Sequence, residues 1–229
     1  MLRQEFYQPF FDEYKELGPV KLGPYSSYDW RHDPRHILFT LARYKFCAKM
    51  LAGKGDILEV GCGDAIGVPI LLQEVEYIYG VDFEAPTIDS NILLNEYPNR
   101  LDFEVLDITE RPLERKFDAG LSLDVLEHIP KDKEENYMSN ICLSLEPNAI
   151  FIFGTPNITS KEYASLQSAQ GHVNLKSHTS LKALLDNYFQ NVLLFSMSDE
   201  VVHTGFYPMA QYLFGVGIGV KGGDVNQTC

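Results

Sequence analysis

The sequence predicts an open, mostly parallel α/β sheet with helices on both faces. Short apolar runs alternate along the chain with helical patterns, and one of these runs leads straight into a glycine-rich turn. Apolar runs separated by helices are typical of parallel strands that are buried on both faces. The length of 229 residues and the hydrophobic content of 45% suit one domain with terminal extensions.

The first part of the chain predicts a helical cover over residues 1–52. Residues 3–16 form an aromatic amphipathic pattern, and a loop rich in glycine and proline follows over 17–30. A helix is expected from His36 to Leu51, because apolar residues recur there at spacings of three and four. Gly53 and Gly55 end this helix.

The core is expected over residues 53–200, followed by a C-terminal extension over 201–229. The polar segment 156–178 follows a strand end, so it is expected to overhang the ligand site as an insertion on the substrate side. A helix, "TSLKALLDNYF", precedes the last predicted strand. The predicted strands are "DILEVGC" at Asp56, "YIYGVD" at Tyr77, "LDFEVLD" at Leu101, "FDAGLSL" at Phe117, "AIFIFGT" at Ala149 and "NVLLFSMSDE" at Asn191.

Composition argues against several classes of protein. The net charge of −13, from 32 acidic and 19 basic residues, argues against nucleic acid as the main partner. The longest late apolar stretch, "YLFGVGIGV", is too short to cross a bilayer, and the start lacks a signal core. The four cysteines show neither close pairing nor zinc spacing, which indicates reduced thiols in a cytoplasmic protein.

The stretch "ILEVGCGDAIG" predicts a loop whose backbone approaches a ligand. A P-loop is excluded because Val68 and Pro69, not Lys and Ser/Thr, follow Gly67. The dinucleotide pattern G-x-G-x-x-G fails by one residue before its last glycine. Glu59 stands just before the turn and would repel a pyrophosphate, so a cationic or amine-bearing ligand fits better. Asp82, at the end of the second strand, could accept ribose hydroxyls or cap a helix.

Five stretches, in order, resemble the class I S-adenosylmethionine (SAM) methyltransferases, and within them the small-molecule subgroup related to ubiquinone and sugar biosynthesis. The resemblance covers roughly residues 55–157 and implies a Rossmann-like sheet of seven strands, SAM as cofactor, and methyl transfer. The stretches are "ILEVGCGDAIG", "YGVDF", "LDI" at Leu106, "FDAGLSLDVLEHIP" and "FIFGTPN", and "GHVNL" at Gly171 fits the same subgroup.

By this resemblance, Glu59, Gly61 and Gly63 surround the methionine part of SAM, and Asp82 binds the ribose. Asp107 binds the adenine amine, or else serves only as a turn residue. Ser122 and Leu123 line the face where the methyl group is transferred. Three neighbours complete the expected cofactor site, namely Cys62, Phe83 and Ile108, although Cys62 could be merely a small buried residue.

Three histidines are candidates for a base that removes a proton from the acceptor: His172, His128 and His178. Each could instead be an ordinary structural or surface histidine. The sequence shows no compact set of metal ligands, so no metal is expected.

The segment "WRHDPRH" concentrates cations in an acidic chain, beside an expected helix start with Asp33 as N-cap and Pro34 at N1. A helix N-terminus with arginines can bind phosphate or carboxylate, which predicts an anionic acceptor such as a phosphorylated or nucleotide-linked sugar intermediate. Alternatively, this segment is only a solvated helix start without a ligand. The expected acceptor-binding residues are Tyr25, Trp30, Arg31, His32 and Arg35.

Three functions remain open from the sequence. The leading one is a SAM-dependent O-methyltransferase for a small polar acceptor, with a quinone-type or other aromatic hydroxyl as the alternative substrate. The second is a methyltransferase-like binding protein without catalysis, and the third is an NAD oxidoreductase, which the glycine spacing opposes.

Overall fold

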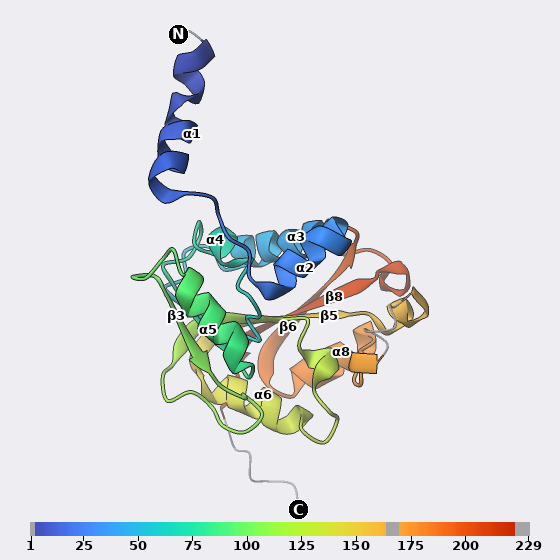
Figure 1. Ribbon diagram of the computed structural model, residues 1–229. Helices are drawn as coiled ribbons and strands as arrows, with labels where there is room; N and C mark the ends of the chain where they lie inside the picture. Colours follow the sequence, from blue (N-terminus) through green and yellow to red (C-terminus); the bar gives the residue numbers. More distant parts are fainter. Residues whose placement is uncertain (1–2, 164–169, 223–229) are drawn as a thin grey trace, which may run out of the picture.

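The computed structural model describes residues 3–163 and 170–222 and shows an α/β sheet of eight strands (Figure 1). The strand order is β3-β2-β1-β4-β5-β8-β6-β7, and the first five strands of this order run parallel. The predicted open, mostly parallel sheet is therefore confirmed. The strands are β1 (Asp56–Val60), β2 (Tyr77–Asp82), β3 (Leu101–Val105), β4 (Phe117–Leu123), β5 (Leu145–Pro156), β6 (Phe189–Ser198), β7 (Val201–His203) and β8 (Tyr212–Val220).

The sheet has one strand more than the seven that the resemblance implied. The additional strand is β7, a three-residue edge strand that pairs antiparallel with β6. β8 lies between β5 and β6, antiparallel to both. Residues 212–220, which were expected in a C-terminal extension, are thus an interior strand, and their glycines allow large side chains to pack against the sheet. A Cβ on Gly217, for instance, would lie 2.4 Å from the ring of Phe189.

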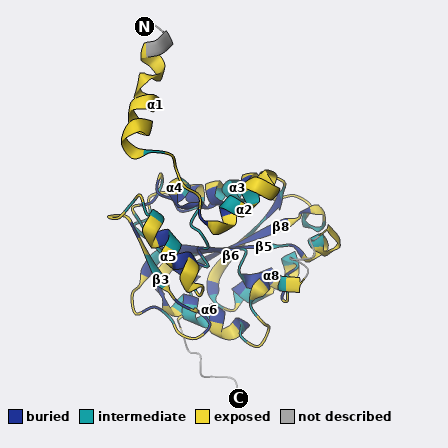
Figure 2. Cartoon of the chain, in the orientation of Figure 1, coloured by how far each residue is buried: buried dark blue, intermediate teal, exposed yellow. Residues whose placement is uncertain are grey.

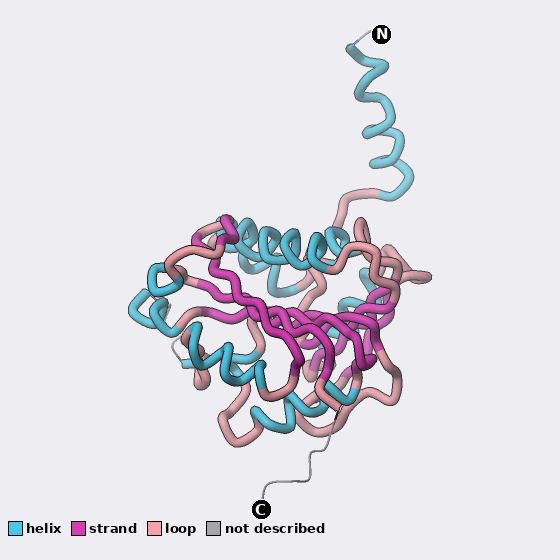
Figure 3. The backbone as a smooth tube through the Cα atoms, turned by 180° about the vertical axis from the view of Figure 1, so that it is seen from behind, coloured by secondary structure: helices cyan, strands magenta, loops and turns pink. Residues whose placement is uncertain are grey.

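The helices cover both faces of the sheet. In Figure 3, α3 runs along one face, and α6 and α8 lie on the opposite face. The helices are α1 (Arg3–Leu17), α2 (Pro24–His32), α3 (Pro34–Met50), α4 (Val68–Leu71), α5 (Ala85–Leu94), α6 (Glu134–Leu143) and α8 (His178–Asp186), with short 3₁₀ turns η1 (Leu126–His128), η2 (Ile158–Tyr163) and η3 (Tyr207–Met209).

Alternation along the strands divides the core into two layers, as the period of two in a strand requires. In β1, Ile57 packs with Tyr44 and Leu51 on the face of α3. Its neighbour Leu58 packs with Tyr137 on the face of α6. Buried residues therefore concentrate along the sheet, whereas α1 is exposed from Glu5 to Leu17 (Figure 2).

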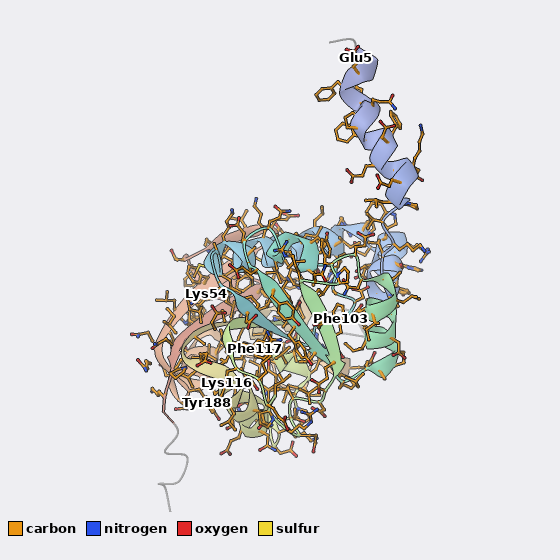
Figure 4. All side chains as sticks on the ribbon, turned by 90° about the vertical axis from the view of Figure 1, so that its left-hand side faces the viewer. Glu5, Lys54, Phe103, Lys116, Phe117 and Tyr188 are labelled. Atoms are coloured by element: carbon orange, nitrogen blue, oxygen red, sulfur yellow. The ribbon has the colours of Figure 1, made fainter. Side chains whose placement is uncertain are left out.

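In the N-terminal segment, one predicted helix is confirmed and one predicted loop is found to be a helix. The expected helix over residues 3–16 is α1, which stands away from the body of the molecule (Figures 1 and 4). Residues 24–30 were expected in a loop but belong to α2, which begins with Pro24 in its first turn, where a missing N–H is harmless. Pro34 plays the same part in α3, with Asp33 at the N-cap as predicted.

Candidate active site

The glycine loop follows β1 at the carboxyl edge of the sheet. Gly61 has φ +71° and Gly63 has φ +49°, conformations that a residue with a Cβ rarely adopts. A Cβ on Gly61 would also lie 2.2 Å from Cγ2 of Val125, in the loop after β4. Glycine at position 61 therefore lets the loops after β1 and β4 touch, which closes the edge where ligands bind in open α/β sheets.

Glu59 points from β1 into the protein and is only 2% exposed. Its Oε1 accepts a hydrogen bond of 2.6 Å from the Tyr44 hydroxyl, whereas its Oε2 is buried without a hydrogen-bond partner among the described residues. Burial raises the pKa of this carboxyl group to about 7, against the opposing effect of the Tyr44 hydrogen bond. An unpartnered buried oxygen of this kind indicates a missing donor, for which a cationic ligand group is suited.

Asp82 ends β2 and holds two neighbouring loops. Its Oδ2 accepts a hydrogen bond of 3.0 Å from the Gly63 N–H, and its Oδ1 accepts one of 3.0 Å from the Glu84 N–H. Glu84, not Asp82, is the N-cap of α5, so the alternative of a helix cap is wrong. Each carboxylate oxygen keeps a further lone pair for a ligand hydroxyl.

The remaining expected cofactor residues fall into two groups. Asp107 is exposed and forms a local turn, in which its Oδ1 accepts hydrogen bonds from the backbone N–H and hydroxyl of Thr109. Phe83 is also exposed, at 69%. The buried group comprises Cys62, Ile108, Ser122 and Leu123.

Ser122 acts within the core. Its hydroxyl donates to the carbonyl oxygen of Val60, at 3.0 Å, and accepts from the hydroxyl of Tyr137, at 2.8 Å. It therefore links β4 to β1 and α6, and its side chain is occupied by the protein itself.

The carboxyl end of β4 carries a polar cluster that the sequence analysis missed. Arg43 of α3 donates to Oδ2 of Asp124 at 2.6 Å, and its guanidinium lies 4.0 Å from the centre of the Tyr212 ring. Asp124 has φ +57°, a conformation uncommon outside glycine. The buried Tyr212 hydroxyl has no hydrogen-bond partner among the described residues. Because the three residues lie on α3, after β4 and on β8, no local pattern in the sequence could reveal them.

Two of the three expected histidines meet beside this cluster. The rings of His128 and His172 lie 5.0 Å apart, and their ligating nitrogens lie within 4.8 Å of each other and of a Glu127 oxygen. The expectation that the chain lacks a compact set of His and carboxylate ligands is therefore wrong. The cluster was missed because His172 lies 44 positions after His128 in the sequence. His178 lies elsewhere and stacks on Tyr207, with ring centres 4.0 Å apart.

Burial shifts the pKa values of Glu127, His172 and His178, and nearby charged groups add to the shift for Glu127 and His172. Burial, followed by the repulsion from Asp124, raises the pKa of Glu127 to about 8. Burial, followed by the neighbouring His128, lowers the pKa of His172. Burial alone lowers the pKa of His178.

The expected acceptor-binding residues on α2 and α3 are all exposed. Arg31 and His32 make hydrogen bonds to carbonyl oxygens one turn earlier in α2, and Arg35 pairs with Asp33. The described contacts thus do not join Trp30, Arg31, His32 and Arg35 into one pocket. Their local contacts are those of solvated side chains at helix ends, which is the alternative to an anion site.

Tyr25 differs from the other four, because it reaches the cofactor edge. Its hydroxyl donates to the Glu84 carboxylate, and its ring would lie 3.7 Å from a Cβ on Gly63. The adjacent Ser26 donates from its N–H and hydroxyl to the carboxylate of Asp64, at 2.7 and 2.9 Å. The start of α2 is therefore fastened over the glycine loop by contacts that the sequence did not indicate.

None of the helices in the described part of the chain combines the length and hydropathy needed to cross a bilayer. The glycine loop, Glu59 and Asp82 at the carboxyl edge of a 3-2-1-4-5 sheet define the class of SAM-binding methyltransferase folds. The chain belongs to the family described as "Methyltransferase domain", whose profile matches residues 30–192. The class predicted from the sequence is therefore confirmed.

Curated relatives agree with this class over part of their length. The chain is 28% identical over 115 residues to a Mycolicibacterium smegmatis protein named "Probable S-adenosylmethionine-dependent methyltransferase", covering 50% of this chain and 42% of that protein. It is 28% identical over 112 residues to the ubiquinone biosynthesis O-methyltransferase of Rickettsia typhi, covering 48% and 44%. The chain thus spans less than half the length of these relatives.

Solved structures share the fold at low sequence identity. The N-methyltransferase NodS from Bradyrhizobium japonicum, bound to S-adenosyl-L-homocysteine (SAH), has a TM-score of 0.59 at 14% identity, covering 83% of this chain and 91% of that chain. The methyltransferase domain of a bacterial protein, CtHen1-C, has a TM-score of 0.65 at 16% identity, covering 80% and 98%. These similarities support the fold.

Proposed function

We propose that this chain binds SAM and transfers its methyl group to a hydroxyl of a small polar acceptor. One observation supports the cofactor assignment above the others: the buried, unpartnered Oε2 of Glu59 beside the glycine loop. SAM carries an α-ammonium group and a sulfonium, and a buried carboxylate attracts such cations. A pyrophosphate at the same place would be repelled.

The other ends of SAM have partners along the same edge. Asp82 supplies carboxylate oxygens for the ribose hydroxyls, while its hydrogen bond to Gly63 keeps the loop in place. Asp107 is exposed and can accept a hydrogen bond from the adenine amine through its second oxygen. β1 and β2 pair directly in register, which brings their carboxyl ends, and hence Glu59 and Asp82, to the same part of the edge.

The reaction is an in-line displacement. An acceptor oxygen forms a bond to the methyl carbon, while the carbon–sulfur bond breaks and its electron pair stays on sulfur as neutral SAH. The protein contributes mainly by aligning acceptor and methyl group, and such alignment can supply several kcal/mol, up to about 7–11 kcal/mol in favourable cases. A hydroxyl acceptor must also lose a proton, and His128 and His172 lie at this end of β4.

The named O-methyltransferases among the relatives support a hydroxyl acceptor, and a quinone-type aromatic hydroxyl is the alternative to an anionic sugar intermediate. The experiment is a panel of hydroxyl, amine and thiol acceptors incubated with methyl-labelled SAM and analysed by mass spectrometry. Label on a hydroxyl oxygen is the expected result. Label found only on nitrogen or sulfur would refute the hydroxyl assignment, and SAM binding without transfer to any acceptor would favour the non-catalytic alternative.

A further inference from the structure

Glu127, His128 and His172 form a cluster that includes none of the residues assigned to SAM, and their side-chain atoms lie close enough together to share one cation. One side-chain atom from each residue lies within 4.8 Å of the other two. Ligand atoms around a tetrahedral zinc ion are about 3.4 Å apart, as bond lengths of about 2.0–2.2 Å require. Small side-chain rotations would therefore bring all three ligands onto one ion.

Glu127 provides the observation that points most directly to a ligand. The residue is 0% exposed, and its Oε2 accepts a hydrogen bond of 3.0 Å from the Thr155 hydroxyl. Its Oε1 is buried without a hydrogen-bond partner among the described residues. Thr155 thus orients Oε2, while Oε1 is available to a ligand, because the described part of the chain supplies no partner for it.

The backbone fixes the two histidines around this oxygen. Nδ1 of His128 lies 3.0 Å from the carbonyl oxygen of Gly171, so that Nδ1 carries the proton and Nε2 keeps a free lone pair. The N–H groups of Val173 and Asn174 donate to the carbonyl oxygen of Glu127, at 2.9 and 3.0 Å. These bonds hold the segment that carries His172 against η1, although the two are distant in sequence.

The cluster lies next to the cofactor edge, where an acceptor would have to approach the methyl group. Glu127 and His128 belong to η1, after β4, and Val125 of the same loop approaches the glycine loop at Gly61. Two imidazoles and one carboxylate leave coordination positions open, and this donor set suits zinc, manganese, iron or cobalt better than magnesium or calcium.

We propose that Glu127, His128 and His172 bind one divalent transition-metal ion that takes the acceptor hydroxyl as a further ligand. This proposal rests on the proposed function for its acceptor, but not for binding of the ion itself. Coordination lowers the pKa of a hydroxyl, so its proton passes to water. The metal-bound oxygen then attacks the methyl carbon, and the sulfur of SAM keeps the electron pair of the broken bond. The histidines are ligands in this account, in place of a proton-accepting role.

The first test uses untagged full-length protein that has been treated with EDTA and dialysed. Titration with Co²⁺ should give visible d–d absorption that saturates at one ion per chain. Glu127→Gln and His172→Ala should each weaken Co²⁺ binding by about tenfold or more. The matched control is His203→Ala on β7, where the histidine contacts Ser198 and Gly205 at the sheet edge.

Circular dichroism checks that each variant is folded, and the semi-exposed His172 provides a variant that leaves the core intact. Absence of the cobalt spectrum in the wild-type protein would overturn the proposal. So would equal Co²⁺ affinity in the wild type, Glu127→Gln and His172→Ala proteins.

A second measurement separates this proposal from the proposed function. SAM affinity is measured by calorimetry after EDTA treatment, and methyl transfer is measured with and without added Mn²⁺ or Zn²⁺. SAM binding that survives EDTA, with transfer restored only by metal, is the expected result. Full transfer in EDTA would overturn the metal proposal alone, whereas loss of SAM binding in every state would contradict the proposed function.

Discussion

Asp82 is a residue on which both the loop and the cofactor are expected to depend. Asp82→Ala should weaken SAM binding by about 2–3 kcal/mol, because a charged acceptor of two hydroxyl hydrogen bonds is lost. Calorimetry measures this directly. Asp102→Ala, which removes an exposed β3 carboxylate bonded to Tyr77, is the control and should leave SAM affinity unchanged. Unaltered affinity in a folded Asp82→Ala protein would remove Asp82 from the cofactor site.

Glu59 should make both stability and SAM binding depend on pH near neutrality. Its pKa is raised by burial to about 7 from a reference of 4.5, so the folded protein holds the proton while the unfolded chain releases it. Glu59 should therefore contribute a fall of about 3 kcal/mol in the free energy of unfolding as pH rises from 4.5 to 7. Glu59→Gln should remove this contribution, as measured by urea unfolding at pH 5 and pH 8, and should leave the contribution of Glu127, whose pKa is raised to about 8.

The same carboxyl group should couple its proton to the ligand. A cation beside Glu59 favours the ionised form, so SAM affinity should increase as pH rises through about 7 and the increase should vanish in Glu59→Gln. Equal pH dependence of the two proteins, for both unfolding and SAM binding, would contradict the role given to Glu59.

At the scale of elements, the contact between the loops after β1 and β4 can be tested at Gly61. Gly61→Ala combines a left-handed backbone with a Cβ 2.2 Å from Val125. Gly53→Ala is the matched control, because Gly53 has φ +80° and no atom within 4 Å of its Cβ position. Gly61→Ala should lower the free energy of unfolding by about 1–3 kcal/mol more than Gly53→Ala. Equal losses would show that backbone strain alone matters at position 61.

The junction of α2 and α3 carries the prediction about the charge of the acceptor. Arg31 and Arg35 are exposed there, so an anionic acceptor that binds them should lose about 1.5–3 kcal/mol of apparent binding per arginine replaced by alanine. The measurement is the acceptor KM, with SAM affinity as the control. A KM unchanged in Arg31→Ala and Arg35→Ala would leave the cluster as a solvated helix junction and favour a neutral aromatic acceptor.

The elements that the sequence predicted are those with a local pattern. Alternating apolar runs marked β1 to β6, and the glycine loop with Glu59 marked the cofactor edge. β8 was missed as a strand because the apolar stretch "YLFGVGIGV" says nothing of its place between β5 and β6. α2 was missed because Gly and Pro at its start read as a loop, although proline is favoured in the first turn of a helix.

At the scale of the whole molecule, the parts of the site that escaped prediction are long-range contacts. Arg43, Asp124 and Tyr212 meet from three distant parts of the chain, and His172 reaches Glu127 and His128 only after the chain has passed through β5. Contacts of this kind depend on how the strands are ordered in the sheet, and no local spacing in the sequence indicates that order. The glycine loop, Glu59 and Asp82, by contrast, lie within one strand–loop–helix unit and the next strand.

The central claim is that the carboxyl edge of the sheet binds SAM, and thermal unfolding with a panel of ligands tests it most directly. A ligand that binds only the folded chain raises the melting temperature, by an amount equivalent to about 2.7 kcal/mol at a hundred times its Kd. SAM and SAH should each raise the melting temperature of the wild-type protein, and NAD should not. A rise with NAD alone, or no rise with either SAM or SAH at saturating concentrations, would contradict the account.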